Sequence, residues 1–117
     1  MARVVILDDY QGVALDMADF SQLHDRCKID VVRENVADRD ALAAMLKGAE
    51  IVVGMRERTV FDADMLSRLP DLRLLITTGM VNKSFDMTAA RAQGVTVCGT
   101  PGGGPVAAEL AFGLLLA

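Results

Sequence analysis

Two stretches of the sequence carry residues that can recognise an anion. Arg56 follows a short apolar run, and its planar guanidinium can bind a carboxylate or a phosphate through two parallel hydrogen bonds. Segment 73–104 contains a Thr-Thr-Gly turn at 77–79, after which backbone N–H groups can face a ligand. Each has a plainer interpretation, because Arg56 can be a solvated surface residue and the turn can simply end a buried strand. Both stretches form one site only if the fold brings them together.

Five apolar runs, each followed by turn residues and a helical stretch, are the elements that must position these residues. The runs are Arg3–Leu7, Lys28–Val32, Ile51–Val53, Leu72–Ile76 and Val95–Cys98. Near-continuous Val, Ile and Leu are typical of parallel strands covered on both faces. The alternation predicts a flavodoxin-like, Rossmann-like three-layer α/β domain, whose five-stranded parallel sheet has the order 2-1-3-4-5 and helices on both faces.

Four helices are predicted between the strands. They are 13–23, 39–47, a short helix opened by a capping box at Thr59–Asp62 and ended before Pro70, and 86–93. Asp38 is the expected N-cap of the second helix, and Gly48 and Gly94 are expected just past two helix ends. Gly12 directly before the first helix and the aspartates within it are unfavourable for a regular helix there.

The strand order places the loops after strands 1, 3 and 4 on one rim. These loops are 8–11, 54–59 and 77–82. Ligands of open parallel sheets bind outside the carboxyl ends of the strands, near the point where the strand order reverses. We therefore expect Arg56 and the turn after Gly79 to share a cleft, while Asp8 and Asp9 can simply cap the first helix.

Composition excludes several classes of protein. The 117 residues suggest one domain, and a net charge of -4 with scattered arginines argues against a nucleic-acid surface. The apolar runs are too short to cross a bilayer, and the sequence does not start like a secretory signal, so we expect a cytoplasmic protein. Cys27 and Cys98 are too few for a disulfide framework or a zinc site, so no metal is expected, and His24 is interpreted as a surface residue.

Residues 105–117 form a different kind of segment. Pro105 suits a first helical turn, and the residues after it carry a single charge and are apolar on nearly every face. A helix of this kind requires burial on all sides, so we expect it to pack against a further domain or a partner copy, most simply in a homodimer.

Four motifs in order resemble the D-isomer-specific 2-hydroxyacid dehydrogenases, the NAD-dependent family that includes phosphoglycerate and glycerate dehydrogenases. Met55–Thr59 is similar to the family's Arg-Ser-x-Thr loop, and Leu75–Gly79 followed by Asp86 is similar to its next loop. Val97–Gly102 resembles its Asn-Thr-Pro-Gly turn, and Glu109 falls at its Ala-Glu pair.

The resemblance implies that this chain is one part of an enzyme. Residues 1–104 would form the substrate domain, and 105–117 would begin the crossover helix to an NAD-binding Rossmann domain. The family's catalytic Arg, Glu and His lie in that second domain, as does the GxGxxG turn, which this sequence lacks. NAD or NADP would be bound mainly there, so the chain alone is expected to be inactive.

The resemblance assigns recognition of the substrate's carboxylate to this part. The substrate would be a small 2-oxo or 2-hydroxy acid, held by backbone N–H groups after Gly79 and by the guanidinium of Arg56. The candidate substrate-binding residues are Arg56, Thr78, Gly79, Met80, Val81 and Asn82. Val81 replaces a glycine of the family, and Ala107 replaces a frequent threonine near the nicotinamide, so the identity of the acid stays open.

Two other readings of the fold are weighed against this one. A signalling receiver domain also has an acidic pair after strand 1, but it needs an aspartate after strand 3 and a lysine after strand 5. Gly54-Met55 and Gly99-Thr100 stand at those places. A freestanding flavodoxin-like binding module would show a polar face on its last helix.

Overall fold

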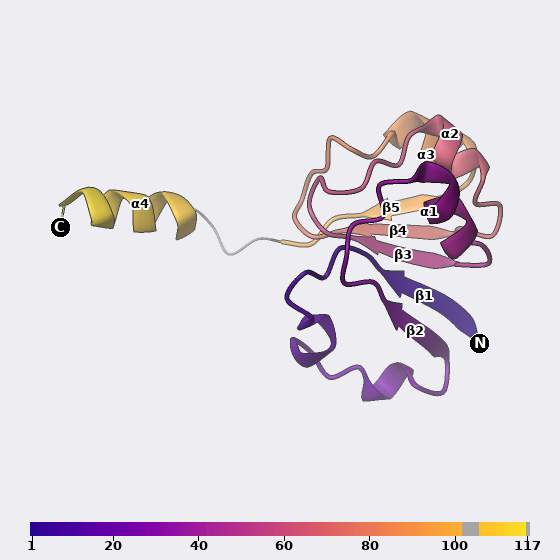
Figure 1. Cartoon of the computed structure of the whole chain (residues 1–117), viewed down its shortest axis with the longest axis horizontal. Helices are drawn as coiled ribbons and strands as arrows, with labels where there is room; N and C mark the ends of the chain where they lie inside the picture. Colours follow the sequence, from indigo (N-terminus) through magenta and orange to yellow (C-terminus); the bar gives the residue numbers. More distant parts are fainter. Residues whose placement is uncertain (102–105, 117) are drawn as a thin grey trace.

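The fold is an all-parallel sheet of five strands, here in a computed structural model that describes residues 1–101 and 106–116, the side chains of 106–109 excepted. The strands are β1 (Ala2–Ile6), β2 (Cys27–Val31), β3 (Ile51–Gly54), β4 (Leu74–Thr77) and β5 (Thr96–Cys98). Their order is β2-β1-β3-β4-β5 (Figure 1). The predicted strand order and parallel pairing are confirmed.

Three short helices cover one face of this sheet (Figure 1). They are α1 (Arg39–Met45), α2 (Ala63–Ser67) and α3 (Met87–Ala92). The side chain of Asp38 accepts hydrogen bonds from the first turn of α1, and Asp86 does the same for α3. Gly48 and Gly94 take positive φ angles of 80° and 77° just past the ends of these helices. The predictions for these two helices are confirmed.

The predicted capping box at Thr59 is wrong. The N-cap of α2 is Asp62, whose Oδ1 accepts a hydrogen bond from the N–H of Met65 at 2.9 Å. This bond and the nearby Arg39 guanidinium hold the pKa of Asp62 below its usual range. The hydroxyl of Thr59 instead donates a hydrogen bond to the carboxylate of Asp8. The chain then runs extended to Phe61, which forms an isolated parallel β-bridge with Phe85 before the helix begins.

The core lies between the sheet and these three helices. Val5, Val52 and Leu75 are neighbours across β1, β3 and β4, and all three are fully buried. Phe61 packs on Phe85 edge to face, with ring centroids 5.4 Å apart. Burial of this face supplies the main stabilisation of the domain.

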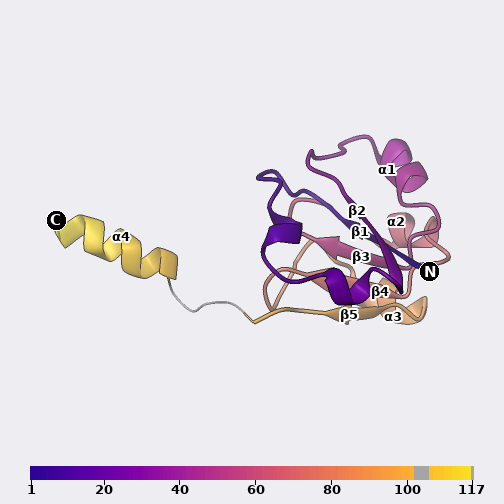
Figure 2. The same ribbon diagram turned by 90° about the horizontal axis from the view of Figure 1, so that it is seen from below.

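The predicted helix over 13–23 is also wrong. Two 3-10 turns stand there, η1 (Ala14–Asp16) and η2 (Ser21–Leu23). The carboxylate of Asp9 accepts the N–H groups of Val13 and Ala14, and that of Asp19 accepts the N–H of Ser21. Such side-chain bonds compete with the helical pattern, and the segment crosses the other face of the sheet without a regular helix (Figure 2).

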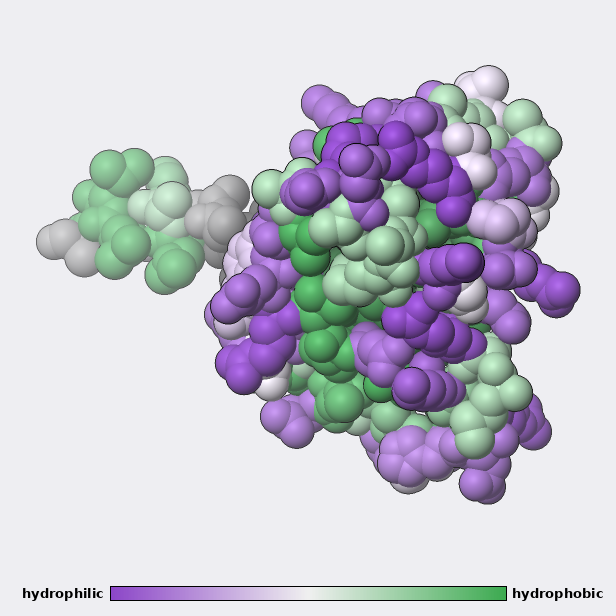
Figure 3. All heavy atoms as spheres, turned by 45° about the vertical axis from the view of Figure 1, so that its right-hand side comes forward, coloured by the Kyte–Doolittle hydropathy of each residue, from purple (hydrophilic) through white to green (hydrophobic). Residues whose placement is uncertain are grey.

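This second face holds an open apolar groove of about 450 Å³. Its floor contains Val4, Ile51 and Leu74, which are register neighbours on β1, β3 and β4, and Met17 and Phe20 line its side. Figure 3 shows a band of apolar residues between hydrophilic margins on the face that it presents. The prediction of helices on both faces is therefore met on one face only. Among the described residues the other face is crossed by the two 3-10 turns and by no α-helix.

The last element is α4 (Val106–Leu116), a helix as predicted. It stands apart from the sheet in Figures 1 and 2. Its large described apolar side chains are 64–83% exposed: Leu110, Phe112, Leu114, Leu115 and Leu116. Predictions for residues 102–105 and for the side chains of Ala107 and Glu109 lie outside the described residues, and the domain boundary at 104 stays a prediction. Within the described ranges no helix is long and apolar enough to cross a membrane.

Substitutions of two neighbouring leucines of β4 test whether one face of the sheet is more deeply buried than the other. Leu75→Ala empties a fully buried core position and is expected to lower the free energy of unfolding by about 2–5 kcal/mol in urea titrations. Leu74→Ala removes the same atoms on the groove side, where the side chain is only partly buried, and should cost clearly less. Equal losses would mean that another segment covers the groove.

Candidate functional site

The candidate site forms where β3 and β4 end side by side. Gly54 lies opposite Thr77 in the register of the two strands. Past the strand ends, the N–H of Thr78 donates to the carbonyl of Gly54 at 3.1 Å, and the N–H of Arg56 donates to Oγ1 of Thr78 at 3.0 Å. The two loops that the strand order was expected to join are in direct contact.

These loops and the turn after β5 enclose an open cleft of about 690 Å³. Its lining residues are Arg56, Glu57, Thr78, Gly79, Val81, Thr100 and Pro101. Four of the six candidate substrate-binding residues are therefore brought together at its wall. Met80 is outside the lining with 68% of its surface exposed, and Asn82 is buried, with 8% exposed.

Three consecutive backbone N–H groups follow Gly79 in the loop that forms one wall of the cleft. The N–H of Gly79 is used, because it donates to Oγ1 of Thr100 at 2.8 Å. For the N–H groups of Met80, Val81 and Asn82, no acceptor is found among the described residues. Consecutive amides of this kind can bind an anion together with the exposed guanidinium of Arg56.

Asn82 has a role in its side chain that the sequence analysis did not foresee. Its Nδ2 donates to the carbonyl of Arg56 and to Oγ1 of Thr77, the latter at 3.0 Å. Its Oδ1 accepts the N–H of Ser84 at 2.8 Å. Both polar atoms of the side chain are therefore hydrogen-bonded within the protein, and only the backbone N–H of Asn82 is left to donate to a ligand.

Thr100 and the turn around it were missed as site residues, although the Thr-Pro-Gly motif could have indicated them. The N–H of Thr100 donates to the carbonyl of Gly79 at 2.9 Å, and its hydroxyl donates to the carbonyl of Thr77 at 3.3 Å. A Cβ on Gly99 would lie 2.9 Å from the carbonyl oxygens of both Gly79 and Met80. Glycine at 99 thus permits the close approach of this turn to the loop after β4.

The side chain of Arg58 contacts the loop after β1, and Arg58 is not among the residues that line the cleft. Its Nη1 donates to the carbonyl of Asp8 at 2.7 Å, and its guanidinium lies 4.2 Å from the centre of the Tyr10 ring. The carboxylate of Asp8 is buried and accepts hydrogen bonds from Asn35 and Thr59. Asp8 therefore joins the loops that follow β1, β2 and β3 to one another.

Asp9 is the acid that caps the first turn. Hydrogen bonds from the N–H groups of Ala14 and, more weakly, Val13 and Gly12 hold the pKa of Asp9 below its usual range. Asp9 therefore satisfies backbone donors, and of the acidic pair only this member has the capping role that the sequence suggested.

Glu57 brings a negative charge to the cleft beside Arg56. Its Oε1 accepts the N–H of Lys83 at 3.2 Å, and its carbonyl accepts the hydroxyl of Ser84 at 3.3 Å. The side-chain charges of the lining residues, one guanidinium and one carboxylate, sum to zero. A wall of zero net charge does not attract an anion as a whole, so an anion here would depend on direct hydrogen bonds to the Arg56 guanidinium and to the free amides.

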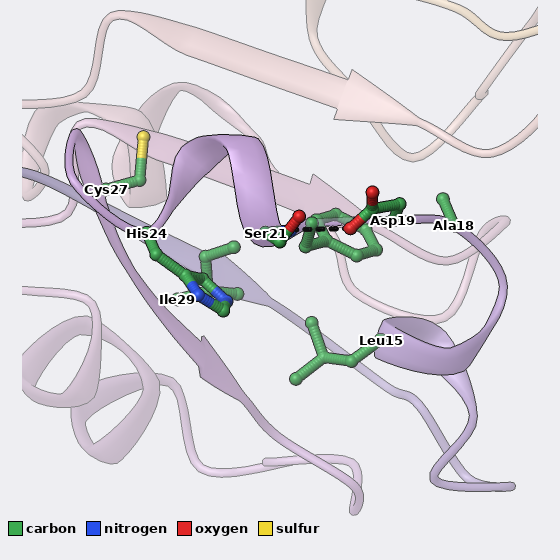
Figure 4. Close-up of a pocket in the computed structure, with 8 residues that line it drawn as sticks. Leu15, Ala18, Asp19, Ser21, His24, Cys27 and Ile29 are labelled. Carbon is green, nitrogen blue, oxygen red and sulfur yellow. Dashed lines mark hydrogen bonds between the residues drawn. The ribbon is translucent and has the colours of Figure 1, made fainter.

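A third hollow, of about 350 Å³, lies beside η2, and hydrogen bonds within a local turn account for the polar groups at its wall. His24 and Cys27 both line it, and a hydrogen bond joins Asp19 to Ser21 (Figure 4). The hydroxyl and N–H of Ser21 hold the pKa of Asp19 below its usual range. This is a local turn that begins η2, and His24 is an exposed residue, as predicted.

The described residues do not fit a dinucleotide or a metal site. The N-termini of α1, α2 and α3 are each capped by an aspartate, which uses the N–H groups that a pyrophosphate would need and would repel its charge. In the part of the chain that the structure describes, no three His, Cys, Asp or Glu residues gather as metal ligands.

Comparison with known proteins agrees with this architecture. The sequence model of the D-isomer specific 2-hydroxyacid dehydrogenase catalytic domain matches residues 4–113. The chain belongs to this family. The receiver-domain and freestanding-module readings are accordingly not favoured.

Relatives of this chain are much longer proteins. It is 37% identical over 81 residues to D-3-phosphoglycerate dehydrogenase of Mycobacterium tuberculosis, covering 68% of this chain and 15% of that protein. It is 29% identical over 97 residues to glycerate dehydrogenase of Methylorubrum extorquens, covering 83% of this chain and 29% of that protein. The solved phosphoglycerate oxidoreductase of Vibrio cholerae superposes with a TM-score of 0.85 at 35% identity, covering all of this chain and 37% of that one.

Gly99 allows a test of the cleft geometry. In Gly99→Ala the methyl group meets two carbonyl oxygens, so we expect displaced backbone amide signals at Gly79 and Met80 in NMR spectra and a loss of about 1–3 kcal/mol in the free energy of unfolding. Gly113→Ala on α4 is the control, since nothing lies within 4 Å of its added methyl. Signal changes confined to residues beside position 99 would contradict the described contact.

Proposed function

We propose that this chain is the substrate-binding part of an NAD- or NADP-dependent oxidoreductase that acts on a small D-2-hydroxy acid or the matching 2-oxo acid. One observation carries the proposal: Arg56 and Val81 line a single cleft beyond the carboxyl ends of the strands, and the N–H groups of 80–82 have no acceptor among the described residues. Membership of the dehydrogenase family supports the reaction class.

The role of the cleft would be to bind and orient the substrate's carboxylate. Arg56 can give two parallel hydrogen bonds to its oxygens, and the amides after Gly79 can give further ones. Fixing the carboxylate leaves C2 at a defined position, where hydride can be delivered or removed. None of these contacts transfers a proton, so the loop would position the substrate and take no chemical part.

The cofactor and the reacting groups would belong to residues outside this chain. Support comes from the aspartate caps, which disfavour a pyrophosphate at α1, α2 and α3, and from the much greater length of the relatives. We propose that a nucleotide-binding domain supplies NAD or NADP and the catalytic Arg, Glu and His. The chain alone would then be inactive, and a cytoplasmic location would give the whole enzyme access to the cofactor pool.

Binding of pyruvate to this chain tests the proposal. We expect a Kd of about 1 mM, because the cleft is open, and a roughly tenfold weaker Kd in Arg56→Gln, which loses a charged pair of donors. Chemical shifts of the amides at 80–82 should follow pyruvate in an NMR titration. NADH in a parallel calorimetric titration should show no binding.

Arg73→Gln is the matched control, since Arg73 is an exposed arginine at the amino end of β4, opposite the cleft. It should bind pyruvate like the unmodified chain. If Arg56→Gln also does so, or if pyruvate shifts no amide between 79 and 82, the cleft does not recognise carboxylates and the proposal is wrong.

We also propose that copies of the chain associate as a homodimer through α4. The helix exposes Leu114, Leu115 and Leu116 by 69%, 83% and 74%, which is costly in water unless a partner covers them. The open groove beneath the sheet is a second apolar surface on the same chain. Association would bury both kinds of surface.

Light scattering of variants tests this association. Leu115→Glu places a charge on the most exposed leucine of α4 and should shift the chain toward a monomer. Met87→Glu changes an exposed methionine on α3 in the same way and should leave the mass unchanged. A monodisperse monomer of the unmodified chain at high concentration would contradict the proposal.

A further inference from the structure

Arg56 has a backbone conformation that ordinary residues rarely adopt. Its φ is 52°, and Asp8 is the only other non-glycine residue with a positive φ in the described ranges. The left-handed region brings Cβ of an L-residue too close to its own backbone, so surrounding contacts must hold such a residue in place. Glycine would take this conformation freely, yet the chain has arginine here.

The loop after β4 supplies these contacts on both sides of Arg56. The N–H of Arg56 donates to Oγ1 of Thr78 at 3.0 Å, and its carbonyl accepts a hydrogen bond from Nδ2 of Asn82. Side chains from a neighbouring loop therefore take both polar backbone groups of one exposed residue. We call this arrangement of Thr78 and Asn82 around Arg56 the peptide clamp.

The clamp is anchored in the interior. Asn82 is buried and also bonds Oγ1 of Thr77, itself 3% exposed, and the N–H of Ser84. Thr78 is tied to β3 through its own N–H and the carbonyl of Gly54. Through the clamp, the backbone of Arg56 is hydrogen-bonded to residues that the strand ends and the interior hold in place, although its own side chain is exposed.

We propose that Thr78 and Asn82 are positioning residues, which hold Arg56 in the left-handed conformation so that its guanidinium stands at the cleft wall. Their side chains act through Arg56, and the side chain of Asn82 is no ligand of the substrate. The functional consequence rests on the proposed carboxylate role of Arg56, whereas the conformational part stands on the clamp contacts alone.

Thr78→Val tests the clamp because it keeps the shape of the side chain and removes the acceptor of the Arg56 N–H. We expect faster hydrogen exchange at that N–H, Arg56 carbon chemical shifts that move away from left-handed values, and a Kd for pyruvate weaker by about fivefold, the worth of roughly one hydrogen bond. Thr78→Ser keeps a hydroxyl and should restore all three readouts. Thr88→Val, at an exposed threonine of α3, is the matched control.

Asn82→Ala tests the other half of the clamp with the same readouts, and urea unfolding shows whether each variant is folded. If folded Thr78→Val keeps the Arg56 carbon chemical shifts and the hydrogen-exchange rate of the Arg56 N–H, the inference is wrong. It is also wrong if the variants lower the free energy of unfolding and change none of these readouts. Failure of the carboxylate role is distinguishable, because Arg56→Gln would then bind pyruvate normally while the shifts and exchange of Arg56 still report on the clamp.

Discussion

The hydrogen-bonded register between β3 and β4 is the constraint on which the site depends. Because Gly54 lies opposite Thr77, the two strands end together and their loops leave the sheet in contact. A slip of one residue would turn Thr77 from the buried face to the groove face and would separate Arg56 from Thr78. The packing of Val52 and Leu75 in the core holds this register, so the interior sets the geometry of the cleft.

The cleft is connected to the core through a short chain of contacts. Phe85 follows the loop that carries Asn82, and its ring packs on Phe61 and over Gly54, where a Cβ would meet it at 2.8 Å. The loop after β4 is thus held at its far end by an aromatic pair and at its near end by the strand. A rigid support of this kind lets an exposed guanidinium keep a defined place without being buried itself.

Local patterns were sufficient for most of the fold. Continuous apolar runs indicated parallel strands, and Asp38, Asp86, Gly48 and Gly94 marked helix ends, because caps depend on the few residues around them. The two failures have one cause. Asp9, Asp19 and Thr59 belong to types that bond either to the local backbone or to a distant partner, and the partner is unknown before the chain folds.

For the site, residue types and strand order predicted which loops meet and that Arg56 and the turn after Gly79 face one cleft. Residue type alone does not separate Arg56 from Arg58, which lie two residues apart, and it was the resemblance to the family's Arg-Ser-x-Thr loop that pointed to Arg56. Packing made the difference, since Arg58 is held by the carbonyl of Asp8 and the ring of Tyr10, while the backbone of Arg56 is clamped and its side chain stays exposed. The hydrogen bonds of the Asn82 side chain and the close approach at Gly99 likewise depend on contacts between segments more than 15 residues apart in the chain. Such contacts form only when the chain folds, so they cannot be predicted from the residues on either side of Asn82 or Gly99.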